Sequence, residues 1–428
     1  MLFNQTLTYI SLFSGAGVGC YGFLEEGFEC IATNETLEKR LNIQRINNKC
    51  KFDEGYICGD IKELEIKEKI LKRIEFYSKN FGNDRVDLVV ATPPCQGMSV
   101  ANHKKKNDEI KRNSLVVESI DLIKQIKPRF FILENVPSFY KTGCIDKNDN
   151  LLEIGTMIEQ NLSGDYMLYD EVINFKNFGA NSNRTRTLVI GVCKEFKDFT
   201  SALEFFPDFK QEKTLKEVIG SLKPLTWGEY DSADFYHSFR TYPKHMQEWI
   251  KDLKEGQSAF ENVQDAISDL AYLCSNEGSF ESDYLNPIQS SYQALMRKDS
   301  PKLYNHQATN HSQAALEKLK LINKEQGKEC LPKNLHGKQQ FKSTWGRLNW
   351  NKISPTIDTR FDTPSNGINS HPELHRSITP REAARIQSFS DDYIFYGNKT
   401  SVCKQIGNAV PPLLALALGK AILKSLRK

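Results

Sequence analysis

A cysteine and a glutamate stand where two apolar runs end. The run Val86–Ala91 leads into the turn Thr92–Gly97, which contains Cys95, and the run Phe130–Leu133 leads directly into Glu134. Both runs are typical of buried strands in a parallel sheet. Because ligands of open α/β folds bind at the carboxyl edge of the sheet, we expect the thiol and the carboxyl group to face one crevice. There they could serve as a nucleophile and an acid.

The surroundings of Cys95 favour a reactive thiol over a structural one. An isolated cysteine is usually an inert, buried, small side chain. The turn Pro93-Pro94-Cys95-Gln96-Gly97, however, exposes the thiol, and nearby backbone amides would lower its pKa. Glu134 follows four apolar residues, where an unpaired carboxylate is costly. A special role is therefore favoured over a helix cap or a solvated strand end.

Two arginines come just before another apolar run. Arg184 and Arg186, in the stretch Asn183-Arg184-Thr185-Arg186, lie on one face of an extended chain. Their guanidinium groups could orient Glu134 or bind a base or a phosphate. A solvated surface pair is the alternative, and these residues alone leave it open.

A second set of residues is typical of a nucleoside pocket. Gly15 and Gly17 follow the first apolar run and allow a tight turn close to a ligand. The loop lacks both the full GxGxxG spacing and a phosphate-binding lysine, so a nucleoside is favoured over a phosphate. Glu35, about 20 residues later, could accept hydrogen bonds from the two hydroxyl groups of a ribose. Asp60 could accept a hydrogen bond from an adenine amino group. The alternative is that both acids cap helices.

A sheet is needed to bring these residues together. From the N-terminus to about Lys194, short β-branched runs alternate with helical stretches, which is typical of a parallel sheet flanked by helices. We predict strands at Thr8–Phe13, Glu29–Asn34, Val86–Ala91, Arg129–Leu133, Met167–Asn174 and Thr187–Cys193. The fold class is therefore α/β.

The rest of the chain has a different character. After Glu195 the alternation is lost, and the segment to about Trp350 is rich in Lys, Asn, Gln, Ser and aromatic residues. Thr379-Pro380-Arg381-Glu382 predicts a capping box that opens a helix to about Ser388. A last helix should begin at Pro411-Pro412 and pack its apolar stripe, which includes Leu414, Leu418, Ala421 and Ile422, onto the first domain.

Composition fits a globular protein of two domains. The chain has 428 residues, of which 39% are hydrophobic, and a formal net charge of +3, which permits a polyanionic partner without requiring one. Its ten cysteines form no CxxC pair and lack clustered histidines, so neither a metal site nor a disulfide framework is expected. The N-terminus has no leader pattern, and Ala409–Gly419 is too short and too interrupted by proline to span a bilayer, which predicts a soluble, cytoplasmic protein.

Seven short motifs, in this order along the chain, resemble the cytosine-C5 DNA methyltransferase family. They are Phe13-Ser14-Gly15-Ala16-Gly17, Asn34-Glu35, Gly59-Asp60-Ile61, Pro93-Pro94-Cys95-Gln96-Gly97-Met98-Ser99, Glu134-Asn135-Val136, Asn183-Arg184-Thr185-Arg186 and Gln405-Ile406-Gly407-Asn408-Ala409-Val410-Pro411-Pro412. The resemblance covers both ends of the chain and leaves only the middle segment uncovered. It implies a Rossmann-like methyltransferase sheet that binds S-adenosylmethionine, with a second, smaller target-recognition domain.

The resemblance also implies a mechanism. The Cys95 thiolate would add to carbon 6 of cytosine and turn the ring into an enamine that attacks a methyl sulfonium. Glu134 would hold a proton at ring nitrogen 3, which requires a raised pKa. Arg186 would contact the ring carbonyl, and Arg184 would support the catalytic pair. Since carbon 6 is inaccessible in a stacked duplex, the cytosine must be flipped out of the helix.

Further roles follow from the same resemblance. Phe13 would stack on the adenine of S-adenosylmethionine, Glu35 would bind the ribose hydroxyls, and Asp60 with Ile61 would read the adenine edge. Gly15, Gly17, Pro94 and Asn408 complete the expected cofactor set, and Gln96, Ser99, Asn135 and Val136 are the expected substrate contacts. The family usually has Asp where this chain has Ser11, and Gln where it has Ser182. Ser11 could still bind a backbone amide, whereas Ser182 leaves the support of Arg184 open.

The domain organisation implied is a catalytic and cofactor-binding domain at 1–194 and a target-recognition domain at 195–351. A hinge segment at 352–397 and a C-terminal helix at 398–428 would follow. The basic run Lys104-Lys105-Lys106, with Lys111 and Arg112, could contact phosphates on a mobile loop or could simply be solvated. Asn305-His306 and Asn310-His311 could read bases or form structural hydrogen bonds.

The function expected is sequence-specific cytosine-5 methylation of double-stranded DNA, as the modification enzyme of a restriction-modification system. Its cognate restriction endonuclease would be a functional partner, no membrane would be involved, and a monomer would suffice. An RNA methyltransferase is one alternative, although the Cys-Phe-Thr signature of that branch is missing here. A catalytically silent DNA-binding relative is the other, although Cys95 and Glu134 are both present. The sequence does not reveal the recognition site.

Overall fold

The computed structural model describes residues 6–94, 113, 115–196, 262–298, 300–324, 326–336 and 343–426. The chain divides into two compact units. Unit 1 consists of Met1–Ile173, Thr185–Phe206 and Ala415–Lys428, and unit 2 consists of Asn174–Arg184 and Pro207–Leu414. The boundaries expected from sequence at 194, 351 and 397 stay a prediction.

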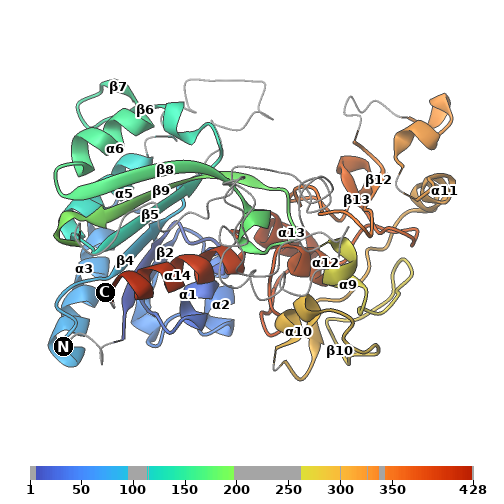
Figure 1. Ribbon diagram of the computed structural model, residues 1–428, viewed down its shortest axis with the longest axis horizontal. Coiled ribbons are helices and arrows are strands. Elements are labelled where there is room, and N and C mark those ends of the chain that lie inside the picture. Colours follow the sequence, from blue (N-terminus) through green and yellow to red (C-terminus); the bar gives the residue numbers. More distant parts are fainter. Residues whose placement is uncertain are drawn as a thin grey trace, which may run out of the picture. The chain divides into compact units, whose positions relative to one another are not determined.

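Unit 1 is built on a seven-stranded sheet with the order β3-β2-β1-β4-β5-β9-β8 (Figure 1). The strands are β1 (Thr8–Leu12), β2 (Glu29–Glu35), β3 (Tyr56–Cys58), β4 (Leu88–Ala91), β5 (Phe130–Asn135), β8 (Tyr166–Asn174) and β9 (Thr185–Cys193). Each of the six strands expected from sequence is present, with ends shifted by no more than two residues. A separate hairpin, β6 (Gly143–Ile145) with β7 (Leu151–Glu153), was not predicted.

The sheet is not wholly parallel, which corrects the expectation from sequence. β1 pairs in parallel with β2 and β4, and β3 and β5 extend this parallel set, but β9 runs antiparallel to β5. β8 and β9 are neighbours in the sheet, and the segment 175–184 that joins them is too short for the helical crossover that a parallel pair needs. The alternation of apolar runs indicates strands but not their direction.

Helices cover both faces of the sheet. On one face, α3 (Leu64–Phe81), α5 (Leu115–Ile126) and α6 (Ile154–Leu162) share the main hydrophobic core with side chains such as Ile10, Val89 and Phe131. On the other face lie α1 (Tyr21–Glu25) and α2 (Glu38–Ile46) (Figure 1). Alternate residues of each strand point to opposite faces, so both faces are apolar and the strands read as continuous hydrophobic runs.

The C-terminal helix α14 (Pro412–Leu426) returns to unit 1 through its second half, as expected. Leu418 and Ile422 are buried, and Lys420 pairs with Glu26 of α1 at 3.6 Å. Within the described part of the chain, one stretch, Lys399–Leu426, is long and apolar enough to cross a membrane on length and composition alone. Most of it is buried inside the protein, and the core helix of a soluble protein passes the same test.

Unit 2 contains shorter elements. Its described helices are α9 (Val263–Ile267), α10 (Ser291–Arg297), α11 (Gln313–Leu321), α12 (Pro380–Ile386) and α13 (Lys399–Gly407), and its strands are β10 (Glu281–Ser282), β11 (Leu303–Tyr304), β12 (Gly346–Arg347) and β13 (Ile368–Ser370). The predicted capping box is confirmed: Glu382 N donates to Thr379 Oγ1 at 3.1 Å, and Thr379 N donates to Glu382 Oε2 at 2.7 Å.

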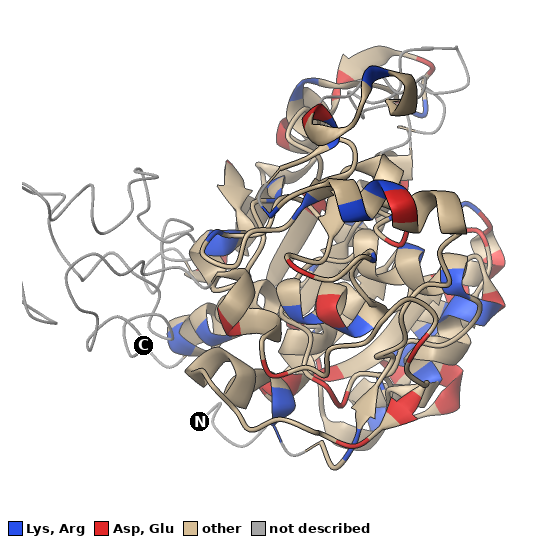
Figure 2. Ribbon diagram, turned by 90° about the vertical axis from the view of Figure 1, so that its right-hand side faces the viewer, with Lys and Arg blue, Asp and Glu red and all other residues tan. Residues whose placement is uncertain are grey.

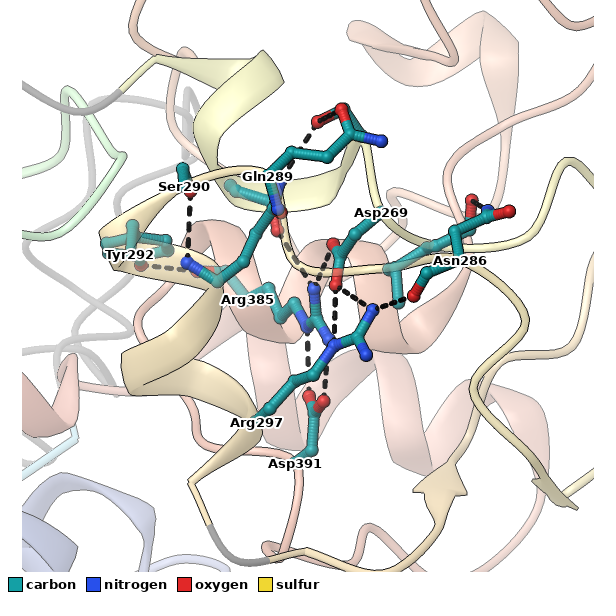
Figure 3. A network of polar contacts seen from close by, with 12 residues as sticks. Asp269, Asn286, Gln289, Ser290, Tyr292, Arg297, Arg385 and Asp391 are labelled. Atoms are coloured by element: carbon teal, nitrogen blue, oxygen red, sulfur yellow. Dashed lines mark hydrogen bonds and ion pairs between the residues drawn. The ribbon is translucent and has the colours of Figure 1, made fainter.

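Buried charges hold unit 2 together (Figure 3). The guanidinium group of Arg385 on α12 donates to both carboxylate oxygens of Asp391, at 3.0 and 2.6 Å, and also to Asp269 at 2.5 Å. Arg297 of α10 reaches the same Asp269 at 2.7 Å. Asp269, Arg385 and Asp391 have fully buried side chains, whereas 13% of the Arg297 side chain is exposed. The network links α10, α12 and the segment after α9.

Candidate active site and cofactor pocket

The loop after β1 turns sharply at the carboxyl edge of the sheet. Phe13, Gly15 and Gly17 all have positive φ angles, of 54°, 56° and 86°. A Cβ atom on Gly15 would meet nothing within 4 Å, so the space beside it is open. A Cβ atom on Gly17 would lie 2.6 Å from Cγ of Gln44, so only glycine fits there. The loop therefore combines a tight turn with room for a ligand.

Glu35 ends the neighbouring strand β2 with a buried carboxylate. Its Oε2 accepts from the amide of Gly15 at 3.0 Å, and its Oε1 accepts from the amides of Thr36 and Leu37 at 3.0 and 3.2 Å. The Nη1 atom of Arg40 lies 3.2 Å from both carboxylate oxygens. This acid is therefore not a helix cap alone, because it joins the glycine loop to the end of β2.

Asp60 and Ile61 follow β3, the next strand along the same edge. The side chain of Asn34 donates to the carbonyl groups of Ile57 and Gly59, both at 3.1 Å, and so fixes this loop beside the end of β2. Asp60 is half-buried and accepts from the amide of Lys62 at 3.0 Å. The side chain of Ile61 belongs to the hydrophobic core, which leaves its backbone as the part that can face a ligand.

Glu134 and Arg186 form an ion pair at the carboxyl end of β5. Arg186 Nε lies 3.1 Å from Glu134 Oε1, and only 17% and 12% of the two side chains are exposed. Arg186 Nη1 also donates to the carbonyl of Thr185 at 2.8 Å. Glu134 pairs with Leu188 in the antiparallel ladder of β5 and β9. This register places Arg186, two residues before Leu188, within reach of the Glu134 carboxylate. Such a shielded pair holds a carboxyl group in a fixed orientation.

The proline turn after β4 is tied to this pair. Asn135, next to Glu134, is buried and donates from Nδ2 to the carbonyl of Pro93 at 2.9 Å. Its Oδ1 accepts from the amide of Val136 at 2.9 Å. On the other side, Thr92 Oγ1 donates to the carbonyl of Phe13 at 3.1 Å. The turn that leads to Cys95 is thus held by both neighbouring strand ends.

Several predicted site residues lie outside the described part of the chain. Cys95, Gln96 and Ser99 belong to this group, as does the basic run from Lys104 to Arg112. Pro94, the last described residue before them, is exposed. The roles expected for these residues stay predictions.

Arg184 is placed differently from Arg186. It is buried in unit 2, where its Nη1 donates to the carbonyl groups of Gly407 and Ile357. Gly407 allows this packing, because a Cβ atom there would lie 2.4 Å from the carbonyl oxygen of Asp358. Asn408 follows at the end of α13 and is exposed. Arg184 therefore stabilises the motif that contains Gly407 and Asn408 through hydrogen bonds to the backbone.

The two departures from the family pattern have different surroundings. Ser11 is buried and its hydroxyl lies 3.4 Å from the thiol of Cys20. Burial raises the pKa of that thiol. The hydroxyl of Ser182 is buried and has no hydrogen-bond partner within the described part of the chain.

The paired histidine motifs of unit 2 make structural hydrogen bonds. The ring of His306 lies 3.0 Å from Thr379 Oγ1 and 2.9 Å from the carbonyl of Ala271, and burial lowers its pKa. His311 Nε2 accepts from the amide of Ser377 at 3.0 Å. Both rings hold the start of the segment that leads into α12.

The cysteines and other potential metal ligands of the described residues are dispersed. Among them, no group of three or more His, Cys, Asp or Glu side chains could hold a metal ion, and every cysteine is a free thiol.

The charged residues of both signs are mixed along the chain: Figure 2 shows Lys and Arg interspersed with Asp and Glu over the ribbon.

Sequence reasoning missed two residues that shape the site, Arg40 and Gln44 on α2. It named Asn135 as a substrate contact but did not foresee its hydrogen bond to the proline turn. The spacing of Arg40 and Gln44, four residues apart on one helix, is the signal that could have revealed them.

Comparison with known proteins identifies the family. The model of the C-5 cytosine-specific DNA methylase family matches residues 7–424. The type II methyltransferase M.DdeI of Desulfomicrobium norvegicum is 28% identical, over 97% of this chain and 88% of its own. The type II methyltransferase M1.HphI of Haemophilus parahaemolyticus is 26% identical, over 99% of this chain and 88% of its own.

Solved structures show the same fold. A prophage-encoded DNA modification methyltransferase (E. coli) superimposes with a TM-score of 0.62 at 21% identity and covers 99% of this chain and all of its own. The Dnmt2 methyltransferase of S. pombe gives a TM-score of 0.51 at 13% identity, with 99% and 100% coverage. With the family match along almost its whole length, this chain belongs to the C-5 cytosine-specific DNA methylases, enzymes that use S-adenosylmethionine as the methyl donor.

Proposed function

We propose that this enzyme is the sequence-specific modification methyltransferase of a type II restriction-modification system, acting as a monomer on double-stranded DNA in the cytoplasm. The two relatives described above are both named type II methyltransferases, which supports this role. The cognate restriction endonuclease would be its functional partner, because methylation of the shared site protects host DNA from cleavage.

One observation carries the catalytic part of the proposal. Glu134 is paired with Arg186, and the adjacent Asn135 binds the turn that leads to Cys95. A carboxyl group, a guanidinium group and the turn before a thiol are thus fixed relative to one another at the carboxyl edge of the sheet. These are the groups that an attack on carbon 6 of cytosine requires.

The proposed reaction begins with addition of the Cys95 thiolate to carbon 6. The electrons of the C5–C6 double bond move toward nitrogen 3, which takes a proton from Glu134. The product is an enamine in which carbon 5 is nucleophilic. Arg186 binds the ring carbonyl oxygen and holds the plane of the Glu134 carboxyl group through Oε1. After carbon 5 has gained the methyl group, loss of the carbon-5 proton to solvent expels the Cys95 thiolate from carbon 6. Nitrogen 3 then returns its proton to Glu134, which restores the aromatic ring and the acid.

The pocket beside the glycine loop fits the cofactor. The open space at Gly15 gives it room, and the buried carboxylate of Glu35 lies at the edge of that loop. S-adenosylmethionine supplies an electrophilic methyl group on its sulfonium when bound. We assign its ribose hydroxyls to Glu35, the edge of its adenine to Asp60 and the backbone of Ile61, and its adenine face to Phe13. Pro94 and Asn408 stay assigned to the cofactor from their motifs alone.

DNA must be distorted for this chemistry. Flipping a cytosine out of the stack costs about a few kcal/mol, which contacts with the DNA must offset. We assign sequence recognition to the region 195–351 and substrate contacts to Gln96, Ser99, Asn135 and Val136. The basic run between Lys104 and Arg112 is assigned to the phosphates.

RNA methylation is the second candidate. The fold of the S. pombe Dnmt2 methyltransferase resembles this chain, but at 13% identity this likeness shows the fold alone. The region 195–351 also lacks a Cys-Phe-Thr sequence. DNA is therefore the substrate we favour.

A first experiment identifies both substrate and site. Unmethylated genomic DNA is incubated with the full-length enzyme and S-adenosylmethionine, then sequenced after bisulfite treatment, with Cys95→Ala as the control. Protected cytosines confined to one short motif and lost in the control support the proposal. Folded enzyme that binds the cofactor but protects no cytosine in DNA would contradict it, and transfer RNA would then be tested.

A second experiment tests the covalent step. A duplex containing that motif is made with fluorine at carbon 5 of the target cytosine. Fluorine does not leave as a cation, so the elimination stops and Cys95 stays attached to carbon 6. With S-adenosylmethionine present, the wild-type enzyme should form a denaturant-resistant adduct with this DNA, whereas Cys95→Ala should not.

A further inference from the structure

Helix α2 presents two polar side chains to the cofactor pocket. Arg40 and Gln44 are four residues apart on Glu38–Ile46, so both lie on the same face of the helix. Arg40 reaches the carboxylate of Glu35 at the end of β2, and Gln44 reaches the glycine loop after β1. Neither residue belongs to the motifs that identify the family.

Gln44 uses its whole amide group to hold the loop. It is fully buried, and its Nε2 donates to Ser14 Oγ and to the carbonyl of Gly15, both at 2.8 Å. Its Oε1 accepts from Thr33 Oγ1 of β2 at 2.7 Å. The side chain also fills the space where a Cβ atom of Gly17 would lie. Gln44 therefore fixes the loop against β2 both by hydrogen bonds and by shape.

Arg40 acts on the other half of the pocket. Its Nη1 lies 3.2 Å from both oxygens of Glu35, and 37% of its own side chain is exposed. No other Lys, Arg or His of the described residues lies within ion-pair distance of this buried carboxylate. The amide of Gly15 donates to the same carboxylate at 3.0 Å. This bond connects the glycine loop, which Gln44 holds, to Glu35, which Arg40 holds.

We propose that Arg40 and Gln44 are positioning residues for the cofactor, which hold the ribose-binding carboxylate and the glycine loop in their binding geometry before the cofactor arrives. This inference rests on the proposed assignment of Glu35 to the ribose hydroxyls. A carboxylate held in place loses less conformational freedom on binding, so its contribution to affinity and ribose selectivity is larger. Neither side chain touches the reacting atoms, so the chemical step does not depend on them.

The test compares two ligands by titration calorimetry: S-adenosylhomocysteine and its 2′-deoxy analogue. Full-length wild type, Arg40→Gln and Arg40→Lys are titrated with each. Arg45→Gln is the matched control, because Arg45 lies on the same helix but pairs with Glu38 and Asp53 at the exposed surface, at 2.6 and 2.7 Å.

Arg40→Gln should raise the Kd of S-adenosylhomocysteine by about fivefold and reduce the preference for the ribose form, because a partly exposed ion pair contributes about 1 kcal/mol, which corresponds to that factor. The KM for S-adenosylmethionine should rise likewise, with kcat and the KM for DNA unchanged. Arg40→Lys should recover part of the affinity, and Arg45→Gln should bind both ligands as the wild type does. Wild-type ribose preference in Arg40→Gln would overturn the inference.

A different result would contradict the assignment of Glu35 to the ribose hydroxyls. If the wild type itself binds both ligands equally, Glu35 does not bind the ribose hydroxyls, and the assignment and the inference are both wrong.

Gln44 is tested separately. Gln44→Met keeps the length of the side chain but removes all three hydrogen bonds, and it should weaken cofactor binding by about tenfold or more. Since a fully buried position is sensitive to change, Ser14→Ala gives a milder test. It deletes one of the Gln44 bonds, together with the bond of 3.1 Å from Ser14 Oγ to the carbonyl of Asn34. It should weaken binding by about threefold at unchanged kcat, and wild-type affinity in Ser14→Ala would contradict the role of Gln44.

Discussion

Asn135 and Pro93 are joined by a hydrogen bond of 2.9 Å from the Asn135 amide nitrogen to the proline carbonyl. This bond links the end of β5, which carries Glu134, to the turn that leads to Cys95. The two groups proposed for catalysis follow strands β4 and β5 in the sequence, and we expect their spacing to depend on such a link. An asparagine fits this role because one amide group can donate to the turn and accept from Val136.

Replacing Asn135 with Ala should therefore slow the chemical step. Removing the donor leaves the buried carbonyl of Pro93 unsatisfied, which costs about 1–3 kcal/mol, and a misplaced turn moves the thiol away from carbon 6. We expect kcat to fall by about 10- to 100-fold while the Kd of S-adenosylhomocysteine is unchanged, measured by single-turnover methyl transfer and calorimetry. Asn80→Ala, which removes an exposed amide on α3, is the control. Wild-type kcat in Asn135→Ala would show that the turn is held by other contacts.

Arg186 should matter for the rate rather than for folding. Its guanidinium group holds Glu134 at 3.1 Å and is assigned to the ring carbonyl of cytosine. Arg186→Gln should lower the single-turnover rate by about 100- to 1,000-fold, as expected for loss of a charged donor in a shielded site. The control is Arg85→Gln, which breaks an ion pair with the exposed Glu195 in the same unit. Equal rates in the two variants would rule out the catalytic role.

The buried network of unit 2 predicts a large loss of stability. Arg385→Met leaves Asp269 and Asp391 buried without their shared partner, which costs about 3–5 kcal/mol (Figure 3). The surface pair of Lys302 with Asp283 provides the comparison, since Lys302→Met removes only an exposed ion pair and should leave the urea midpoint close to that of the wild type. Urea denaturation of both variants measures the difference. Similar midpoints would mean that the network adds little net stability.

Much of the catalytic unit was predictable because its signals are local. A buried parallel strand is a continuous apolar run, so β1, β2, β4 and β5 were found from sequence, and polar residues at their ends marked the shared edge. The capping box at Thr379 was found for the same reason. The direction of β9 was not, because strand direction depends on how the chain returns to the sheet.

Contacts across the fold were less predictable. Arg184 and Arg186 alternate along one stretch, and their spacing suggested one shared role. In the structure Arg186 pairs with Glu134, whereas Arg184 donates to carbonyl groups of Ile357 and Gly407, more than 170 residues away in sequence. No local pattern encodes such partners.

Acid should destabilise unit 2 through His371. Burial lowers the pKa of this imidazole to about 4 from an ordinary value of 6.5. Its Nδ1 accepts from the amides of Glu373 and Leu374, both at 3.1 Å, which requires an unprotonated nitrogen. The unfolded chain takes up the proton near pH 6.5, so this contribution is complete above that pH and is lost as the pH falls toward about 4.

The measurement is Tm as a function of pH. We expect the Tm of the wild type to fall between pH 7.5 and pH 5. His371→Gln should have a lower Tm at pH 7.5 but a smaller fall on acidification, because its amide does not titrate. An equal fall in both proteins would assign the acid sensitivity to other groups, such as His311, whose pKa is also lowered to about 4 by burial.

Gly15 allows the conformational and the ligand-binding roles of the glycine loop to be separated. Gly15 and Gly27 both have positive φ angles, of 56° and 83°, and a Cβ atom on either would meet nothing within 4 Å. Alanine at either position should therefore cost about 1 kcal/mol of stability from backbone strain alone. Only at Gly15 does the new methyl group enter the space assigned to the cofactor. Gly15→Ala should weaken S-adenosylhomocysteine binding by at least about tenfold, whereas Gly27→Ala should bind it as the wild type does. Equal affinities in two variants of equal stability would mean that the cofactor does not lie against this loop.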